Sequence, residues 1–156
     1  MADRLFDPND LMSQEVEANA TKREPLPVGE VNAQITEIKF ESGMSKAKPG
    51  KESRPWCRMD ATCEITDPDY LKGVGDGTRE KAVVFVGIMV DMKDGRVAVG
   101  ADRNVELGRF REAAGVNGQP LQALIGQYVR LSIVHEPHYQ RPDETVHKVA
   151  NFAAPQ

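Results

Sequence analysis

The sequence predicts a mainly β fold in one domain: a five-stranded barrel with a helix between the third and fourth strands. Three observations support this prediction. Several short segments alternate apolar and polar residues with the period of two that strands have. Clusters of glycine, proline and aspartate separate these segments. Only one longer stretch has the spacing of an amphipathic helix, and 156 residues suffice for one domain with its own core.

The N-terminal segment differs from the rest of the chain in charge. The first thirty residues hold seven acidic against three basic residues, and two prolines then end the segment because proline does not continue a helix. We therefore divide the chain into an acidic arm, residues 1–24, and a domain, residues 25–156. Within the arm, Asp10 or Ser13 is placed to cap a short helix over residues 11–20. The arm is expected to be flexible or, alternatively, to dock a partner.

The first two strands are predicted on either side of a loop. Residues 31–40 form the first strand, and its apolar parity switches between Ile35 and Ile38, which predicts a β-bulge. Residues 41–55 form the loop, and residues 56–65 form the second strand. The apolar positions of the second strand are expected to face the core: Cys57, Met59, Ala61, Cys63 and Ile65. The other positions are expected to face outward: Trp56, Arg58, Asp60, Thr62 and Glu64.

The second half of the chain supplies the remaining elements after a glycine-rich loop over residues 67–78. Residues 82–92 are apolar at both parities, which is typical of a central strand covered on both faces. A Lys-Asp-Gly turn signal and a short return strand over residues 96–99 follow. The later elements are a helix over 103–114 capped by Gly115, a short helix over 119–125, and strands over 128–135 and 146–152. The helix stripe is expected to include Val105, Leu107 and Phe110.

Five strands with a helix between the third and fourth are the element order of an OB-fold, a small and partly open barrel. Five short motifs follow one another along the chain: residues 27–35 (PVGEVNAQI), Ser45-Lys46 with Gly50, Lys72-Gly73, residues 108–110 with 113–115, and residues 124–129. In this order they resemble a family of small phage-encoded OB-fold proteins that bind single-stranded DNA. The resemblance covers roughly residues 25–153. It implies a role in phage DNA replication or recombination.

The most basic part of the chain lies around the first loop. Residues 39–58 hold six basic and two acidic residues, a local charge of +4 in a chain of net charge −4. The basic residues are Lys39, Lys46, Lys48, Lys51, Arg54 and Arg58. Such a patch binds phosphates, and Trp56 within it offers a flat ring for a base to stack on. The alternatives are that the lysines form only a solvated loop and that Trp56 covers the end of the barrel.

Two further groups are candidate contacts for DNA. Tyr128 and Arg130 share the outward parity of the fourth strand. His138, Tyr139 and Arg141 lie in the loop before the fifth strand, a usual contact site in OB-folds.

Motifs for catalysis are missing from the sequence. It contains no nucleophile elbow, zinc-protease motif, P-loop or dinucleotide fingerprint, so we predict a protein that is not an enzyme and uses no cofactor or metal. Two weaker alternatives are a metal held by three histidines and a nuclease site of aspartates. The histidines are His135, His138 and His147, and the aspartates are Asp67, Asp69, Asp76, Asp91 and Asp94.

The expected ligand is single-stranded DNA, bound without base-specific contacts. Replication or recombination proteins are expected as partners of the arm, and a homodimer remains open. No signal peptide or bilayer-spanning apolar run is found, which predicts a cytoplasmic protein, in the host cytoplasm if phage-encoded. The acidic net charge and the scarcity of aromatic residues favour an alternative, a non-enzymatic virion structural or adaptor protein built on an OB-like barrel.

Overall fold

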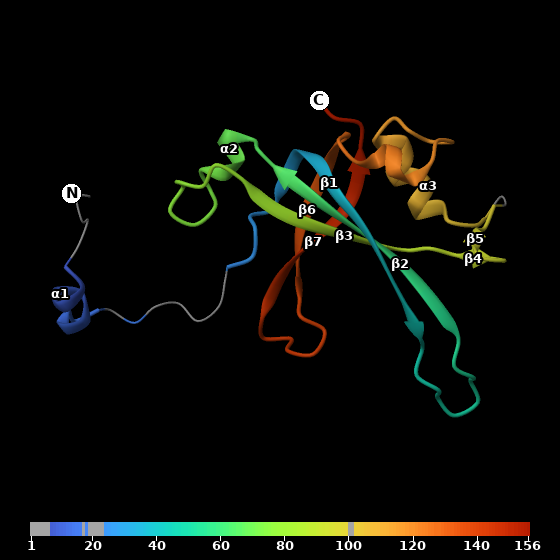
Figure 1. Ribbon diagram of the computed structural model, residues 1–156, viewed down its shortest axis with the longest axis horizontal. Helices are drawn as coiled ribbons and strands as arrows, with labels where there is room; N and C mark the ends of the chain where they lie inside the picture. The colour runs from blue at the N-terminus through green and yellow to red at the C-terminus, as the bar shows by residue number, and fades with distance from the viewer. Residues whose placement is uncertain (1–6, 17, 19–23, 100–101) are drawn as a thin grey trace.

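The fold is mainly β, as predicted, and is built on one antiparallel sheet of five strands (Figure 1). The computed structural model describes residues 7–16, 18, 24–99 and 102–156. The strands lie in the order β3-β2-β1-β6-β7. Their bounds are β1 (Gly29–Met44), β2 (Pro55–Ile65), β3 (Ala82–Met89), β6 (Tyr128–Pro137) and β7 (Thr145–Ala153).

The other elements are short. A two-stranded hairpin follows β3, and the described residues form four helical segments outside the sheets. These elements are β4 (Met92–Lys93), β5 (Arg96–Val97), α1 (Pro8–Ser13), α2 (Pro68–Leu71), α3 (Val105–Ala113) and the 3-10 turn η1 (Leu121–Leu124). No helix in the described part of the chain has the length and apolar character that crossing a bilayer requires.

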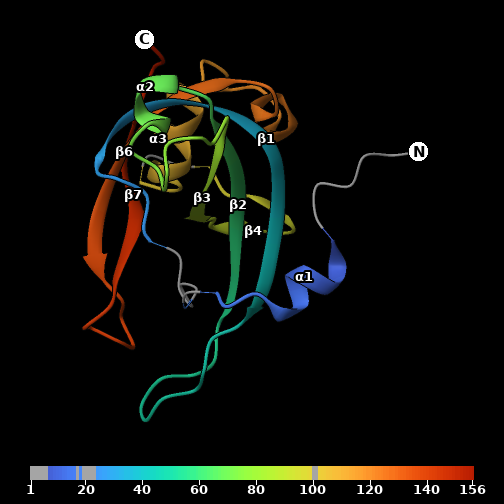
Figure 2. The same cartoon turned by 90° about the vertical axis from the view of Figure 1, so that its left-hand side faces the viewer.

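Strand β1 carries the predicted bulge, and it belongs to both halves of the sheet. Its first residues pair with β6, its later residues pair with β2, and the register with β2 shifts between Ile35 and Glu37. A bulge bends a strand and increases its twist. In Figure 2, β1 accordingly arches over the top of the molecule, with β6 and β7 on one side and β2 and β3 on the other. The β1–β2 loop and the β6–β7 loop therefore extend from the same end of the molecule (Figures 1 and 2).

The predicted closure of the sheet into a barrel is not formed. Strands β3 and β7 are the two edges of the sheet. Helix α3 contacts both edge strands, and its Phe110 ring meets Phe152 of β7 edge-on with the ring centroids 5.0 Å apart. A groove of about 320 Å³ remains between the edges, lined mainly by residues 85–87 of β3 and residues 147–149 of β7. The helix thus bridges two edges that do not hydrogen-bond to each other.

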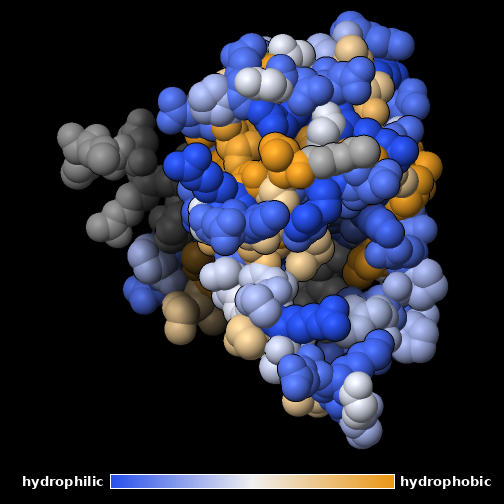
Figure 3. Space-filling model, turned by 90° about the vertical axis from the view of Figure 1, so that its right-hand side faces the viewer, coloured by the Kyte–Doolittle hydropathy of each residue, from blue (hydrophilic) through white to orange (hydrophobic). Residues whose placement is uncertain are grey.

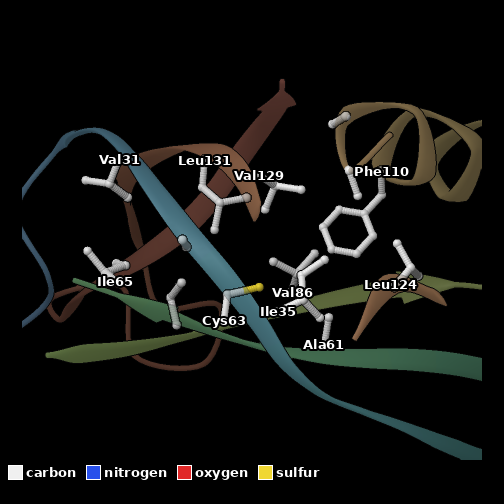
Figure 4. Packing of buried hydrophobic residues seen from close by; sticks show 14 of the residues in the cluster. Val31, Ile35, Ala61, Cys63, Ile65, Val86, Phe110, Leu124, Val129 and Leu131 are labelled. Carbon is white, nitrogen blue, oxygen red and sulfur yellow. The ribbon is translucent and has the colours of Figure 1, made fainter. Parts of the chain in front are cut away.

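The inner face of the arch holds the hydrophobic core. Figure 4 shows side chains of β1, β2, β3 and β6 converging with Phe110 of α3 and Leu124 of η1. The predicted alternation in β2 is confirmed, because Met59, Ala61, Cys63 and Ile65 are all fully buried. Cys57, the fifth member of the predicted set, is half-buried and packs at the border of the core.

The prediction that the third strand is central was wrong. Strand β3 is an edge strand whose residues alternate between buried and exposed. Its outer face is not covered, and Val83, Phe85 and Met89 are 41%, 69% and 55% exposed. Apolar residues at both parities are typical of two covered faces. Here one of the two faces lies open to solvent, and the strand ends at Met89 instead of residue 92.

The segment after β3 turns as predicted. Asp94 and Gly95 both have positive φ, 54° and 75°, which is the conformation of a type I′ hairpin turn. The Asn104 side chain closes the base of the hairpin, because its Oδ1 accepts from the Asp91 N–H at 2.6 Å and its Nδ2 donates to the Ala98 carbonyl at 2.9 Å. Figure 3 shows apolar side chains among charged ones on one side of the molecule. In the segment after β3, Met92, Val99 and Val105 are exposed. Of the predicted apolar stripe of α3, Leu107 and Phe110 are buried, while Val105 at the start of the helix is exposed.

The predicted helices and loops differ from the structure at several boundaries. Helix α1 begins earlier than predicted because Asp7 caps it, accepting from the Asn9 N–H at 2.9 Å. It ends at Ser13, and residues 17 and 19–23 of the arm lie outside the described residues. The first four residues of the predicted loop 41–55 continue β1 instead, since they pair with β2. Helix α2 interrupts the second predicted loop where the Asp67 carboxylate caps the following backbone.

Residues 24–28 form a strap that runs from the arm to β1. Leu26 of the strap is buried in the core. Its N–H donates to Nδ1 of His147 at 3.0 Å, and its carbonyl accepts from Nε2 of His135 at 2.6 Å. The Tyr70 hydroxyl donates to the Pro27 carbonyl at 2.7 Å, and burial raises the pKa of Tyr70 to about 12. Side chains from β6, β7 and α2 thus hold the strap from three sides.

Candidate nucleic-acid interface

The tip of the β1–β2 hairpin, residues 45–54, carries the most concentrated positive charge of the candidate site. Its basic residues are Lys46, Lys48, Lys51 and Arg54, all exposed, against one acid, Glu52, which gives a local charge of +3. None of the four forms an ion pair within the part of the chain that the structure describes. Their charge is therefore available to an external anion.

Backbone hydrogen bonds give the hairpin tip a defined shape. The Ser45 N–H donates to the Arg54 carbonyl at 2.8 Å, and Lys48 and Lys51 pair through both of their backbone groups, at 2.8 and 3.2 Å. Gly50 turns the chain with a φ of 79°, a conformation that favours glycine. Lys48 and Lys51 are thus presented from a turn.

The two predicted cations on the sheet itself are already paired. Lys39 lies 3.5 Å from the Glu37 carboxylate. Arg58 donates from Nε to Asp60 Oδ1 at 2.8 Å and from Nη2 to Asp60 Oδ2 at 3.2 Å, and it also pairs with Glu41. The two carboxylates raise the pKa of the Arg58 guanidinium, with the larger effect from Asp60 and the smaller from Glu41. The predicted patch of +4 is therefore divided into a neutralised part on the sheet and an unpaired part at the tip.

Trp56 lies between these two parts. It is half-buried on the outer face of β2, where it pairs across the strands with Gly43, and it does not belong to the buried cluster. The Arg58 guanidinium lies over the indole, 5.9 Å from the ring centroid. This distance is within the range of a cation–π interaction. The ring thus lies at the base of the hairpin tip and not over the core.

The structure adds residues on β3 that sequence reasoning missed. The β2–β3 register places Met89 opposite Arg58, Phe85 opposite Thr62 and Val83 opposite Glu64, so these apolar side chains share the outer face with Trp56. Phe85 is the aromatic member of this row. The sequence shows apolar residues at Val83, Phe85 and Met89, on one parity of β3. Because the other parity is apolar too, the sequence pattern predicted two covered faces and no exposed apolar row.

The β6–β7 loop presents a preformed pair of rings. His138 and Tyr139 stack with centroids 5.2 Å apart and an angle of 15° between the planes. The His138 Nδ1 accepts from the backbone N–H groups of Gln140 at 3.1 Å and Arg141 at 3.3 Å. Arg141 pairs with Glu144 at 3.2 Å, while Tyr139 is 86% exposed. The loop therefore offers a stacked aromatic surface, and its one arginine is paired.

Tyr128 and Arg130 do not join the hairpin group. Tyr128 pairs across the strands with Gln34, which is ten positions along β1 from Met44 at the hairpin end. At about 3.3 Å per residue, this places Tyr128 roughly 33 Å from the hairpin along the strand. Arg130 is also engaged, since its Nη2 lies 3.3 Å from the Glu30 carboxylate. These two residues form a separate patch.

Most side chains of the metal and nuclease alternatives make other contacts. His135 and His147 hold the backbone of Leu26, and His138 is fixed within its own loop. Asp67 caps α2, and Asp91 pairs with Arg103. No group of three or more potential ligands that would hold a metal ion is found among the described residues.

Comparison of the chain with protein-family models and with curated proteins finds no match. The arrangement of charge and rings described above is therefore the basis on which a function is proposed.

Proposed function

We propose that this protein binds single-stranded DNA without sequence specificity and is not an enzyme. One observation carries the proposal. The hairpin tip that holds the unpaired cations ends at Arg54, two residues before Trp56, and Trp56 lies on the outer face of the sheet. A positive surface for phosphates beside a flat ring for bases is the combination that single-strand binding needs.

The two parts of the interface have different tasks in this proposal. Lys46, Lys48, Lys51 and Arg54 contact phosphates, because their charges are not neutralised within the described chain. Bases stack on Trp56 and Phe85. The neighbouring cations Lys39 and Arg58 are held in ion pairs, so this part of the sheet offers phosphates little attraction. Tyr139 and His138 extend the stacking surface from the second loop.

We also propose that the sheet is an OB-fold-like, partly open barrel. The strand order β3-β2-β1-β6-β7, a helix between β3 and β6, and a first strand that serves both halves of the sheet support this assignment. In that fold the second and third strands and two loops form the ligand surface. The outer face of β2 and β3 and the loops at 45–54 and 138–144 correspond to these places.

The biological setting belongs to the same proposal. The sequence resemblance supports a phage-encoded protein that acts in DNA replication or recombination in the host cytoplasm. The arm is proposed to recruit other proteins of that process, because α1 buries no side chain and exposes Leu11 and Met12, and Val16 after the helix is exposed as well. No cofactor or metal is part of the proposed activity.

One observation favours a second candidate, a virion structural or adaptor protein. The outer face of the edge strand β3 exposes Val83, Phe85 and Met89 together. An exposed apolar edge strand is a site where another chain can pair. This candidate predicts tight self-association, or association with another protein, and no affinity for DNA.

Intrinsic fluorescence tests the proposed function, since Trp56 is the single tryptophan of the chain. Titration with oligo(dT) is expected to quench Trp56 emission at low salt, and a duplex of matched length is expected to quench it less. Light scattering on the same samples reports the oligomeric state. Stable self-association with unchanged emission in the presence of DNA would instead support the second candidate.

A further inference from the structure

Gly43 contacts Trp56 more closely than any side chain at its position would allow. The two residues face each other across β1 and β2. A Cβ added to Gly43 would lie 2.8 Å from Cζ2, 3.0 Å from Cε2 and 3.2 Å from Nε1 of the indole. The Nε1–Cζ2 side of the ring is therefore seated directly against the strand at Gly43.

The backbone does not explain the glycine. Gly43 is not among the residues with positive φ, and it pairs within a regular part of the β1–β2 ladder. A glycine inside a strand costs stability, and it often marks a place where another group approaches the backbone closely. Here the approaching group is the indole of Trp56.

A second contact fixes one face of the same ring. Arg58 lies over the indole, and Asp60 and Glu41 hold its guanidinium in place. On the opposite side of β2, a Cβ at Gly87 would lie 3.4 Å from both Arg58 Cδ and Asp60 Oδ1. At Gly87 this is ordinary van der Waals contact, so the close approach in this row is the one between Gly43 and Trp56.

We propose that Gly43 is a positioning residue of the DNA interface: it seats the indole of Trp56, which Arg58 also covers, so that the exposed part of the ring is held in place for a base. This inference rests on the proposed single-strand binding. It predicts that Gly43 acts only through Trp56 and makes no contact with DNA itself. The loss of DNA affinity on replacing Gly43 therefore depends on whether the indole is present.

A double-mutant cycle of Gly43→Ala and Trp56→Ala tests the inference, with oligo(dT) affinity as the readout. Each single change is expected to weaken binding by roughly 5- to 150-fold, the range for losing one stacked base. In the Trp56→Ala background, which leaves room for the new Cβ, Gly43→Ala is expected to have no further effect. The emission maximum of Trp56 is expected to shift in Gly43→Ala before any DNA is added. Gly108→Ala serves as the control, because a Cβ there meets no heavy atom within 4 Å.

Two results would overturn the inference. One is a Gly43→Ala variant with unchanged emission and unchanged affinity. The other is an equal loss of affinity in the presence and absence of Trp56, which would show a contribution independent of the ring. If the unaltered protein does not bind oligo(dT) at low salt, the proposed function itself fails, and the emission shift still reports whether Gly43 seats the indole.

Discussion

The backbone N–H of Leu26 donates a hydrogen bond to Nδ1 of His147, 121 residues further along the chain, at 3.0 Å. Only the unprotonated nitrogen accepts this bond. Burial, and then the neighbouring charge of His135, lower the pKa of His147. The strap is therefore held by the neutral form of the imidazole.

Stability is expected to fall as the pH falls below the unfolded-state pKa of His147, about 6.5. The unfolded chain takes up a proton there, while the folded chain does so only at lower pH, so protonation favours unfolding. Loss of this hydrogen bond is expected to lower the free energy of unfolding by about 1 kcal/mol, which lowers Tm by roughly 2–4 °C. Thermal unfolding between pH 7.5 and 5 measures this loss. His147→Gln is expected to flatten the profile, and an unchanged slope in that variant would assign the pH dependence to other groups.

The lysines of the hairpin tip are expected to set the salt dependence of DNA binding. Each phosphate contact contributes about 0.7 to the slope of log K against log salt for a single strand. Replacement of Lys46, Lys48 and Lys51 by alanine is therefore expected to reduce the magnitude of the slope by about 2. Lys72→Ala, a lysine in a loop away from the hairpin, is the control. An unchanged slope in the triple variant would remove the hairpin from the interface.

Phe85 is expected to contribute to DNA affinity and not to folding. Its side chain is 69% exposed on the outer face of β3. Phe85→Ala is expected to weaken oligo(dT) binding by about 1–3 kcal/mol. Its effect on the free energy of unfolding is expected to stay within about 0.5 kcal/mol. Loss of self-association with unchanged DNA affinity would instead point to the structural or adaptor role.

Phe110 is expected to be essential for stability, because it is fully buried and joins α3 to Phe152 of β7. Phe110→Ala is expected to destabilise the fold by about 3–5 kcal/mol. Urea unfolding measures this loss, and Tyr139→Ala, a change at an exposed ring, is the comparison. Equal midpoints for the two variants would contradict the assigned bridging role of α3.

Local sequence patterns predicted much of the fold. The parity switch between Ile35 and Ile38 located the bulge in β1, and the alternation of β2 identified its buried face. The wrong prediction that β3 is a central strand has a physical cause. A local sequence pattern shows whether a residue is apolar, but not whether a neighbouring element covers it. The edge position of β3 follows from pairing across the whole chain, which short-range patterns do not contain.

The candidate site was only partly predictable for a similar reason. The basic loop and Trp56 are adjacent in sequence and were identified together. The pairing of Arg58 with Glu41, 17 positions away, depends on strand register, and so does the seat of Trp56 on Gly43. Counting charges along the chain therefore overestimated the free positive charge on the sheet.

The central claim is that the hairpin cations hold the phosphates of a single strand. Fluorescence anisotropy of a labelled oligo(dT), titrated with the protein at several salt concentrations, tests it most directly. Four phosphate contacts predict binding that weakens with salt at a slope of about −3, with a matched duplex competing poorly. Absence of binding at low salt, or binding that does not change with salt, would contradict the account.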